Sequence, residues 1–120
     1  MNESIKILNE CIELQIKKGA DYQADASSVK QADYYPRGVA TILDIILAKY
    51  LRLKSVIEKY EACGGSPNNE SIEDSAKDLI NYASFLAAYC RCGISGQDLD
   101  RDILNRPVHL QLSNSRATNE

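Results

Sequence analysis

The sequence lacks an excess of basic residues, a long apolar run and a secretion signal. Its 14 Lys and Arg residues stand against 17 Asp and Glu residues, so the formal net charge is -3. Duplex DNA or RNA is therefore not an expected partner, although a small phosphate ligand needs only a few local cations. No stretch approaches the roughly 20 apolar residues of a membrane span. The first residues also lack the charged and then apolar pattern of a signal peptide, so we expect a cytoplasmic protein without a membrane partner.

Zinc-type ligand spacing is absent as well. The four cysteines are Cys11, Cys63, Cys90 and Cys92, and the only histidine is His109. Cys90-Arg-Cys92 together with His109 matches no standard zinc pattern. In a reducing cytoplasm the four cysteines are expected to be thiols. The roles of Cys90, Cys92 and His109 are left open by the sequence.

Internal repeats and low-complexity tracts are missing too, and 120 residues suit one domain. Apolar residues at helical spacing predict main helices over residues 2–18, 38–62 and 71–92, and a short fourth helix over 97–105. Residues 20–36 read as a long loop with one short turn of helix. We therefore expect an all-α fold, a small helical bundle over residues 1–106. An extended C-terminal tail or arm over residues 107–120 completes the chain.

Local signals place the helix ends. Gly19 is positioned to end the first helix and Gly93 the third. Ser71 reads as the N-cap of the third helix, with Asp74 at its third helical position. The first helix is expected to bury a stripe of Ile5, Leu8, Ile12 and Ile16, widened by Ile7, Cys11 and Leu14. The fourth helix is expected to turn Leu99, Ile103 and Leu104 inward.

The helix over residues 38–62 has an apolar arc covering roughly two thirds of its circumference, wider than the stripe of an ordinary surface helix. The arc contains Val39, Ile42, Leu43, Ile46, Leu47, Tyr50, Leu53 and Ile57, with Ile45, Leu51 and Val56 on its flanks. Such a helix is either central in its domain or packed on a second subunit. We predict a homo-oligomer built partly on this helix.

Cations on the second helix raise two possibilities. Lys49 falls within the apolar arc and Arg52 lies on its edge. Lys49 can extend its stem over the core and keep its head in water, or pair with an acid of the third helix. Alternatively, Lys49, Arg52 and the loop residue Arg37 hold the phosphates of a ligand.

The third helix opens with an acidic ladder of Glu70, Asp74 and Asp78, spaced four residues apart. Like charges at this spacing oppose helix formation, although the first two acids favour the helix dipole. The ladder is a solvated face with Asp78 paired to Lys49 or Arg52, a magnesium site, or a set of acceptors for a ligand's hydroxyls and base edge.

Aromatic side chains are few, with seven tyrosines, one phenylalanine and no tryptophan. Five of them, together with Asn81, are placed to contact a base or to form core and rim: Tyr34, Tyr35, Tyr82, Phe85 and Tyr89. Tyr34 and Tyr35 are the pair least explained by packing alone. The candidate ligand-binding set therefore comprises Tyr34, Tyr35, Arg37, Lys49, Arg52, Asp78, Asn81, Tyr82 and Phe85.

A family resemblance rests on four segments: KGADY over residues 18–22, Gly38, KYLRL over residues 49–53, and ESIEDSAKDLINYA over residues 70–83. With these, the chain resembles the phage-encoded nucleotide modification associated domain family. That family is similar in outline to the all-helical nucleoside triphosphate pyrophosphohydrolases, the MazG and dUTPase group. The resemblance implies magnesium-binding acids on two helices, an E-x-x-E pair on one and an E-x-x-D pair on the next. Here Asp44 and Glu58 of the middle helix lie fourteen residues apart.

Three functions remain in contention from the sequence. The first is a nucleotide-binding protein without catalysis. In a phage setting it would act in the host cytoplasm and sequester a nucleotide or nucleotide-derived immune signal of cyclic dinucleotide or ADP-ribose type. The second is a magnesium-dependent pyrophosphohydrolase or nucleotide-modification enzyme with Glu70, Asp74 and Asp78 as ligands. The third is a structural or protein-interaction domain, favoured if Lys49 bonds only to Asp74 or Asp78 with no cavity beside them.

Overall fold

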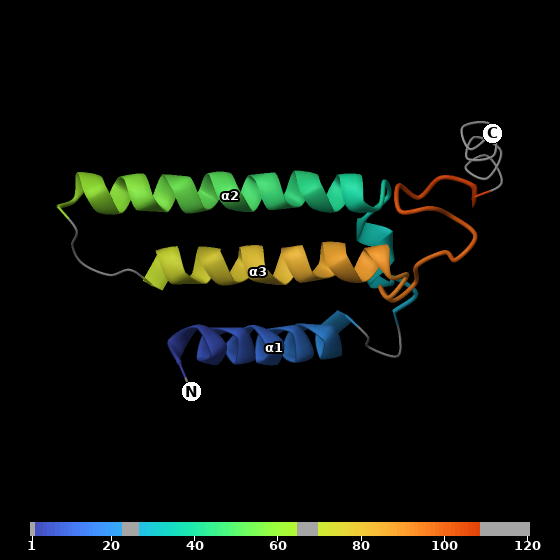
Figure 1. Cartoon of the computed structure of the whole chain (residues 1–120), viewed down its shortest axis with the longest axis horizontal. Coiled ribbons are helices and arrows are strands. Elements are labelled where there is room, and N and C mark those ends of the chain that lie inside the picture. Colours follow the sequence, from blue (N-terminus) through green and yellow to red (C-terminus); the bar gives the residue numbers. More distant parts are fainter. Residues whose placement is uncertain (1, 23–26, 65–69, 109–120) are drawn as a thin grey trace.

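The computed structural model describes residues 2–22, 27–64 and 70–108 and is all-helical over these ranges. In chain order the elements are α1 (Glu3–Tyr22), the 3-10 helix η1 (Gln31–Tyr34), α2 (Val39–Ala62) and α3 (Glu70–Cys90). The three long helices lie side by side, with α3 between α1 and α2 (Figure 1). The predicted all-α class with three main helices is confirmed. None of the helices in the described ranges is both long and apolar enough to cross a membrane.

The most deeply buried side chains gather where the start of α2 meets the end of α3. Ile42 is fully buried, and Tyr89 and Tyr35 are 2% and 4% exposed. The rings of Tyr35 and Tyr89 meet edge to face with centroids 6.5 Å apart, a favoured aromatic geometry. Ile94, which follows α3, closes this cluster. Packing therefore explains Tyr35, contrary to the sequence-based prediction, and the cluster anchors the short helix η1 against the bundle.

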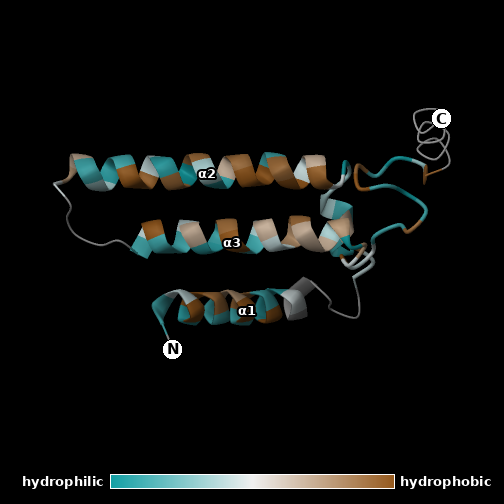
Figure 2. Cartoon of the chain, in the orientation of Figure 1, coloured by the Kyte–Doolittle hydropathy of each residue, from teal (hydrophilic) through white to brown (hydrophobic). Residues whose placement is uncertain are grey.

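Helix α1 turns inward a flank of the predicted stripe and not its centre. Hydrophobic residues recur along all three helices (Figure 2), but the four-residue stripe of α1 is mostly exposed. Its members Ile5, Leu8, Ile12 and Ile16 are 45%, 49%, 54% and 69% exposed. Instead Cys11 is buried and its thiol lies 4.0 Å from the Lys77 carbonyl oxygen of α3. This burial raises the pKa of the Cys11 thiol, which keeps it protonated and suits a packing role.

An ion-pair bridge adds to the α1–α3 contact. The Lys77 ammonium of α3 lies 3.3 Å from Glu10 of α1 and 3.0 Å from Glu73 on its own helix. The hydrogen bond to Glu73, joined by the one to Glu10, raises the pKa of Lys77. The contact between α1 and α3 therefore includes a polar bridge, where the sequence predicted only an apolar stripe.

Three helix ends differ from the prediction. Helix α1 continues through Gly19 to Tyr22, because glycine within a helix costs only about 1 kcal/mol relative to alanine. Helix α3 starts at Glu70, so Ser71 is a helical residue and not the N-cap. The same helix ends at Cys90, and Cys92 already has a positive φ of 58°. Residues 65–69, His109 and the tail beyond it lie outside the described residues.

Helix α2 has the predicted bounds, and its broad apolar arc is divided between two environments. Ile42 is buried and Ile45 is half-buried on the side that faces α3. Leu43 and Leu47, on the opposite side, are 59% and 54% exposed. Since α2 packs on α3 at the edge of the layer (Figure 1), its second side is open.

The predicted fourth helix over residues 97–105 is wrong. This segment forms turns and one isolated antiparallel bridge between Arg101 and Pro107. The Asp98 carboxylate accepts the Asp100 backbone N–H, and Asp102 accepts those of Leu104 and Arg106. Local bonds of this kind compete with the helical pattern. Leu99 and Ile103, predicted to point inward, are 71% and 44% exposed.

Asp102 makes this segment sensitive to acid. Hydrogen bonds from Arg106, including one of 2.8 Å from its Nε, lower the pKa of Asp102 below the usual 3.8. A lowered folded-state pKa stabilises the fold above the unfolded-state pKa, and this contribution is lost as the pH falls through the folded-state pKa. We expect Asp102→Asn to lower the urea midpoint at neutral pH, with the difference from wild type shrinking below about pH 4. Asp100→Asn, which removes the same charge nearby, should change the neutral midpoint less.

Candidate functional site

A cavity of about 360 Å³ opens between the end of α1, helix η1, the first half of α2 and the middle of α3. Its volume lies at the lower end of the roughly 300–1,000 Å³ typical of small-molecule sites. The described lining residues are Gln15, Lys18, Gly19, Gln31, Tyr34, Tyr35, Ile45, Asp78, Asn81, Tyr82 and Phe85. Aromatic rings, side-chain amides, one cation and one carboxylate thus converge on one space.

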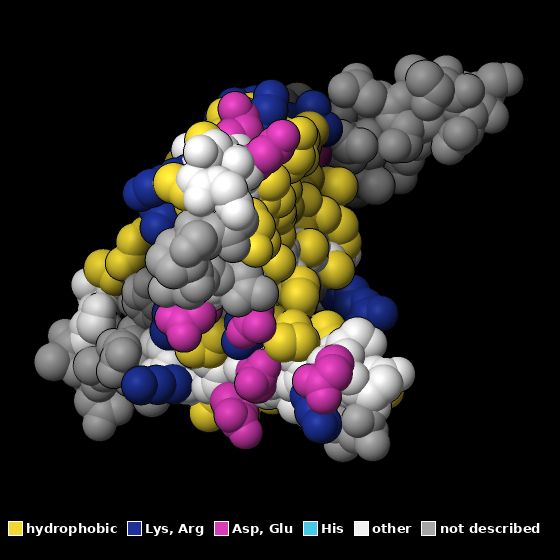
Figure 3. All heavy atoms as spheres, turned by 90° about the vertical axis from the view of Figure 1, so that its left-hand side faces the viewer, with side chains coloured by type: hydrophobic (Ala, Val, Ile, Leu, Met, Phe, Trp, Pro, Cys, Tyr) yellow, Lys and Arg dark blue, Asp and Glu magenta, His cyan; other side chains and the backbone are white. Residues whose placement is uncertain are grey.

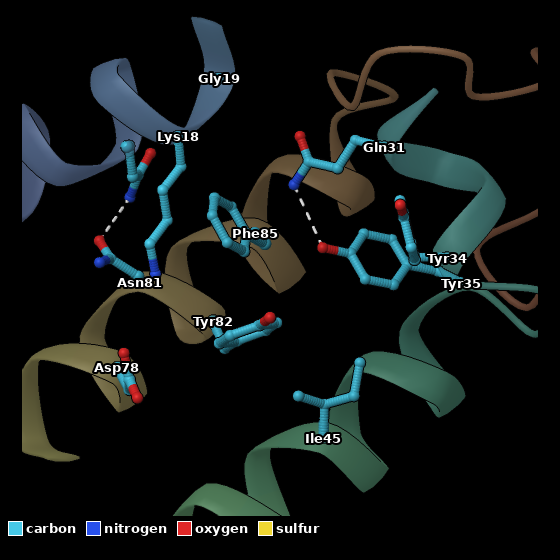
Figure 4. A pocket seen from close by; sticks show the side chains of 11 residues that line it. Lys18, Gly19, Gln31, Tyr34, Tyr35, Ile45, Asp78, Asn81, Tyr82 and Phe85 are labelled. Carbon is cyan, nitrogen blue, oxygen red and sulfur yellow. Dashed lines mark hydrogen bonds between the residues drawn. The ribbon is translucent and has the colours of Figure 1, made fainter. Parts of the chain in front are cut away.

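Helix α3 supplies one wall as consecutive turns of a single face. Asp78, Asn81, Tyr82 and Phe85 are spaced so that they project together toward the cavity (Figure 4). The Tyr82 and Phe85 rings meet edge to face at 5.3 Å between centroids. This contact holds the two rings in a fixed relative orientation, so the wall is preformed.

A network of amide hydrogen bonds joins α1 to this wall. The Gln15 side-chain amide of α1 donates to Asn81 Oδ1 at 2.8 Å and to Ser84 Oγ at 2.9 Å. Ser84 Oγ in turn donates to the Asn81 backbone carbonyl at 2.7 Å. Asn81 is only 7% exposed, so its partner matters for stability. The bonds fix the position of the Asn81 amide at the edge of the cavity.

The η1 side contributes a second polar and aromatic group. Tyr35 is buried by the core, yet its phenol oxygen reaches the cavity and accepts a 3.2 Å hydrogen bond from Gln31 Nε2. Tyr34 next to it is 55% exposed at the rim. Tyr82 and Phe85 lie between this group and Lys18, which approaches from α1 (Figure 4). The cavity therefore has an aromatic middle and polar groups on both sides.

Lys49 of α2 lies beside the cavity, in contact with two of its lining residues. Its ammonium lies 3.5 Å from Asp78 Oδ2 and 5.4 Å from the centre of the Tyr82 ring. Both groups of the ion pair are about one-third exposed, so the pair adds little stability. Its effect is positional, since Lys49 neutralises Asp78 and also lies over the Tyr82 ring. The predicted pairing of Lys49 with an acid of the third helix is therefore seen.

The predicted phosphate clamp is not assembled. Arg37 is exposed beside the start of α2, where its backbone N–H donates to Thr41 Oγ1 at 2.9 Å. Arg52 is also exposed and does not line the cavity. Among the described lining residues, the only cation is Lys18. Lys18 appeared in the sequence only as part of the KGADY segment.

The acidic ladder does not come together as a metal site. Asp78 lines the main cavity, whereas Asp74 lines a shallower depression with Glu10, Glu13 and Lys77. Glu70 is the first residue of α3. Within the described ranges no three Asp, Glu, Cys or His side chains are grouped to hold a metal ion. The predicted magnesium ligands Glu70, Asp74 and Asp78 thus lack the required geometry.

The sequence therefore named six of the lining residues and missed others. Tyr34, Tyr35, Asp78, Asn81, Tyr82 and Phe85 were all predicted as candidates. Gln15, Gln31 and Ile45 were not, because a glutamine beside an apolar stripe, a glutamine in a polar loop and an isoleucine within a stripe give no functional signal. Comparisons with protein-family models, with curated proteins and with solved structures each returned no match.

Proposed function

We propose that the cavity binds a nucleotide-type small molecule and holds it without chemical change. The observation that carries this proposal is the convergence of aromatic rings, amides and a single lysine on a cavity of about 360 Å³. Every nucleotide base can stack on an aromatic ring. Amide side chains match the paired donors and acceptors of a base edge. A lysine supplies the point charge for a phosphate.

Each part of the cavity suits one part of such a ligand. The base stacks on the Tyr82 and Phe85 rings, with Gln31 and Asn81 at its polar edge. Lys18, at the α1 side, faces the phosphate. The volume suits a mononucleotide or one nucleotide unit of a cyclic dinucleotide or ADP-ribose derivative. The resemblance to phage nucleotide modification domains motivates the proposal that the protein sequesters such a signal.

The alternatives receive less support. A purely structural role predicts that Lys49 pairs with Asp78 and that no cavity adjoins the pair; the pairing is present, but a cavity adjoins it. Magnesium-dependent hydrolysis, the second candidate, needs carboxylates positioned to hold the metal ion. Asp78 is the only carboxylate among the described lining residues, and it is paired with Lys49.

Calorimetric titration with nucleoside monophosphates, cyclic dinucleotides and ADP-ribose tests the proposal. We expect at least one ligand to bind more tightly than millimolar and to be recovered unchanged. Tyr82→Ala should weaken binding about 10- to 100-fold, because stacking contributes roughly 1–3 kcal/mol per base. Lys18→Met should weaken the nucleotide more than the matching nucleoside.

Tyr60→Ala is the matched control, since Tyr60 lies near the end of α2 and does not line the cavity. It should leave the affinity unchanged. Failure of every ligand to bind below millimolar, or equal losses for Tyr82→Ala and Tyr60→Ala, would refute the proposal.

A further inference from the structure

Helix α2 carries a row of large apolar side chains that the chain itself leaves open. We name as the α2 outer face Leu43, Leu47, Tyr50, Leu51 and Ile57, which are 59%, 54%, 51%, 53% and 42% exposed. Figure 3 shows hydrophobic side chains gathered in a continuous strip on one face of the upper part of the molecule, where α2 lies. A contiguous apolar strip of this kind marks an interaction surface.

We propose that the α2 outer face binds the same face of a second copy, with the two α2 helices antiparallel. The two ends of the face lie symmetrically about Tyr50. Leu43 and Ile57 each lie seven residues from it, so a two-fold axis near Tyr50 places Leu43 of one copy opposite Ile57 of the other. A surface that is complementary to itself in this way is what an isologous dimer requires.

The charges on the helix fit the same arrangement. Asp44 is the only acid in the first half of α2, and Lys54 lies in the second half, between Leu51 and Ile57 of the outer face. Both side chains are exposed. An antiparallel pair with its axis near Tyr50 brings Asp44 of each copy within two residues, or about 3 Å along the helix axis, of the level of Lys54 of the other. A parallel pair would instead place identical charges at the same level, which is unfavourable.

The available area also favours this face over the other open stripe. A large side chain that is half exposed offers on the order of 100 Å². The five residues of the α2 outer face therefore offer about 1,000 Å² in a pair of copies, which reaches the lower bound for a specific interface. The α1 stripe, with only four residues, offers about 800 Å² in a pair, in the range of nonspecific contacts.

The dimer face is separate from the proposed ligand cavity. Ile45 is the α2 residue among the described cavity-lining residues. On a helix at 100° per residue it points away from Tyr50 by about 140°. The dimer and the ligand site can therefore be tested independently of each other.

Sedimentation equilibrium at micromolar protein should give the mass of a dimer. Leu47→Glu combined with Leu51→Glu should weaken the dimer at least 100-fold and yield a monomer, with helical content retained in circular dichroism. The matched control, Leu8→Glu combined with Ile12→Glu on the α1 stripe, should remain dimeric. A monomeric wild type, or loss of the dimer only in the α1 variant, overturns the proposal; the latter would assign the interface to α1.

A charge swap tests the antiparallel register and does not depend on the double glutamate variant folding. Asp44→Lys alone should weaken the dimer, because it faces Lys54 of the second copy. Adding Lys54→Asp to the same chain should restore it. If the double swap is no tighter than Asp44→Lys alone, the antiparallel pairing is wrong.

Discussion

Replacing Ile42 by alanine is expected to lower the free energy of unfolding by about 2–5 kcal/mol, the range for truncating a buried isoleucine. Ile42 is the largest fully buried side chain in the described ranges. It packs with Tyr35, Tyr89 and Ile94 at the junction of α2, η1 and the end of α3. Alanine would leave a cavity that rigid aromatic neighbours cannot fill. Because a domain of this size has little stability to spare, the variant should be close to unfolding at room temperature.

Urea denaturation followed by circular dichroism measures this effect. Ile16→Ala is the matched control, because Ile16 on α1 is 69% exposed. The same atoms are removed there, yet the loss should stay below about 1 kcal/mol, as for most surface substitutions. Similar losses at the two positions would mean that the core does not lie at the α2–α3 junction.

The comparison of these two isoleucines shows what periodicity could and could not predict. The periodicity located α2 correctly, since a long apolar arc identifies a helix whichever element packs against it. The periodicity could not show which part of the arc is buried against a neighbouring helix. In α1 the row of Ile5, Leu8, Ile12 and Ile16 is more apolar than the covered side, but the ion-pair bridge of Lys77 and the Gln15 amide network hold the other side against α3. Such polar contacts depend on residues about 66 positions apart, which no local pattern records.

In the segment after α3, hydrogen bonds from backbone N–H groups to aspartate side chains compete with helix formation. Leu99, Ile103 and Leu104 have helical spacing, which predicted a fourth helix. Asp98 and Asp102 instead bind nearby backbone N–H groups, and Asn105 adopts a positive φ of 60°. The aspartates within this short apolar pattern indicated a turn and not a helix, because aspartate side chains favour turns over helix interiors.

The residues of the candidate site were likewise predictable only in part. The α3 wall was predictable, because Asp78, Asn81, Tyr82 and Phe85 follow one helical face and include the rarer aromatic residues. The place of Lys18 at the cavity was not predictable, because it depends on α1 continuing to Tyr22 past Gly19. Lys49, one of three cations predicted to hold phosphates, instead pairs with Asp78 of α3, which was the alternative prediction.

Replacing Gly38 by alanine should be as damaging as loss of the Ile42 side chain. Gly38 precedes α2 with a φ of 58° and a ψ of -129°, a region that non-glycine residues rarely adopt. Strain of this kind costs about 1–3 kcal/mol. An added Cβ would also collide with the Ile103 carbonyl oxygen and approach Cε1 of Tyr89 to 3.0 Å. Since the Val39 N–H donates to that same Ile103 oxygen at 2.9 Å, relief of the collision requires the contact between α2 and the Ile103 segment to open.

Gly19→Ala is the matched control, and it should change stability in the opposite direction. Gly19 lies inside α1, and nothing in the described residues comes within 4 Å of an added Cβ. Alanine there should stabilise the helix by about 0.5–1 kcal/mol, because glycine pays the larger backbone entropy cost on folding. Thermal unfolding of the two variants beside wild type gives the sign of each effect. If Gly19→Ala destabilises the protein, the chain turns at Gly19 as its sequence first suggested, and the α1 side of the cavity, including Lys18, is placed differently.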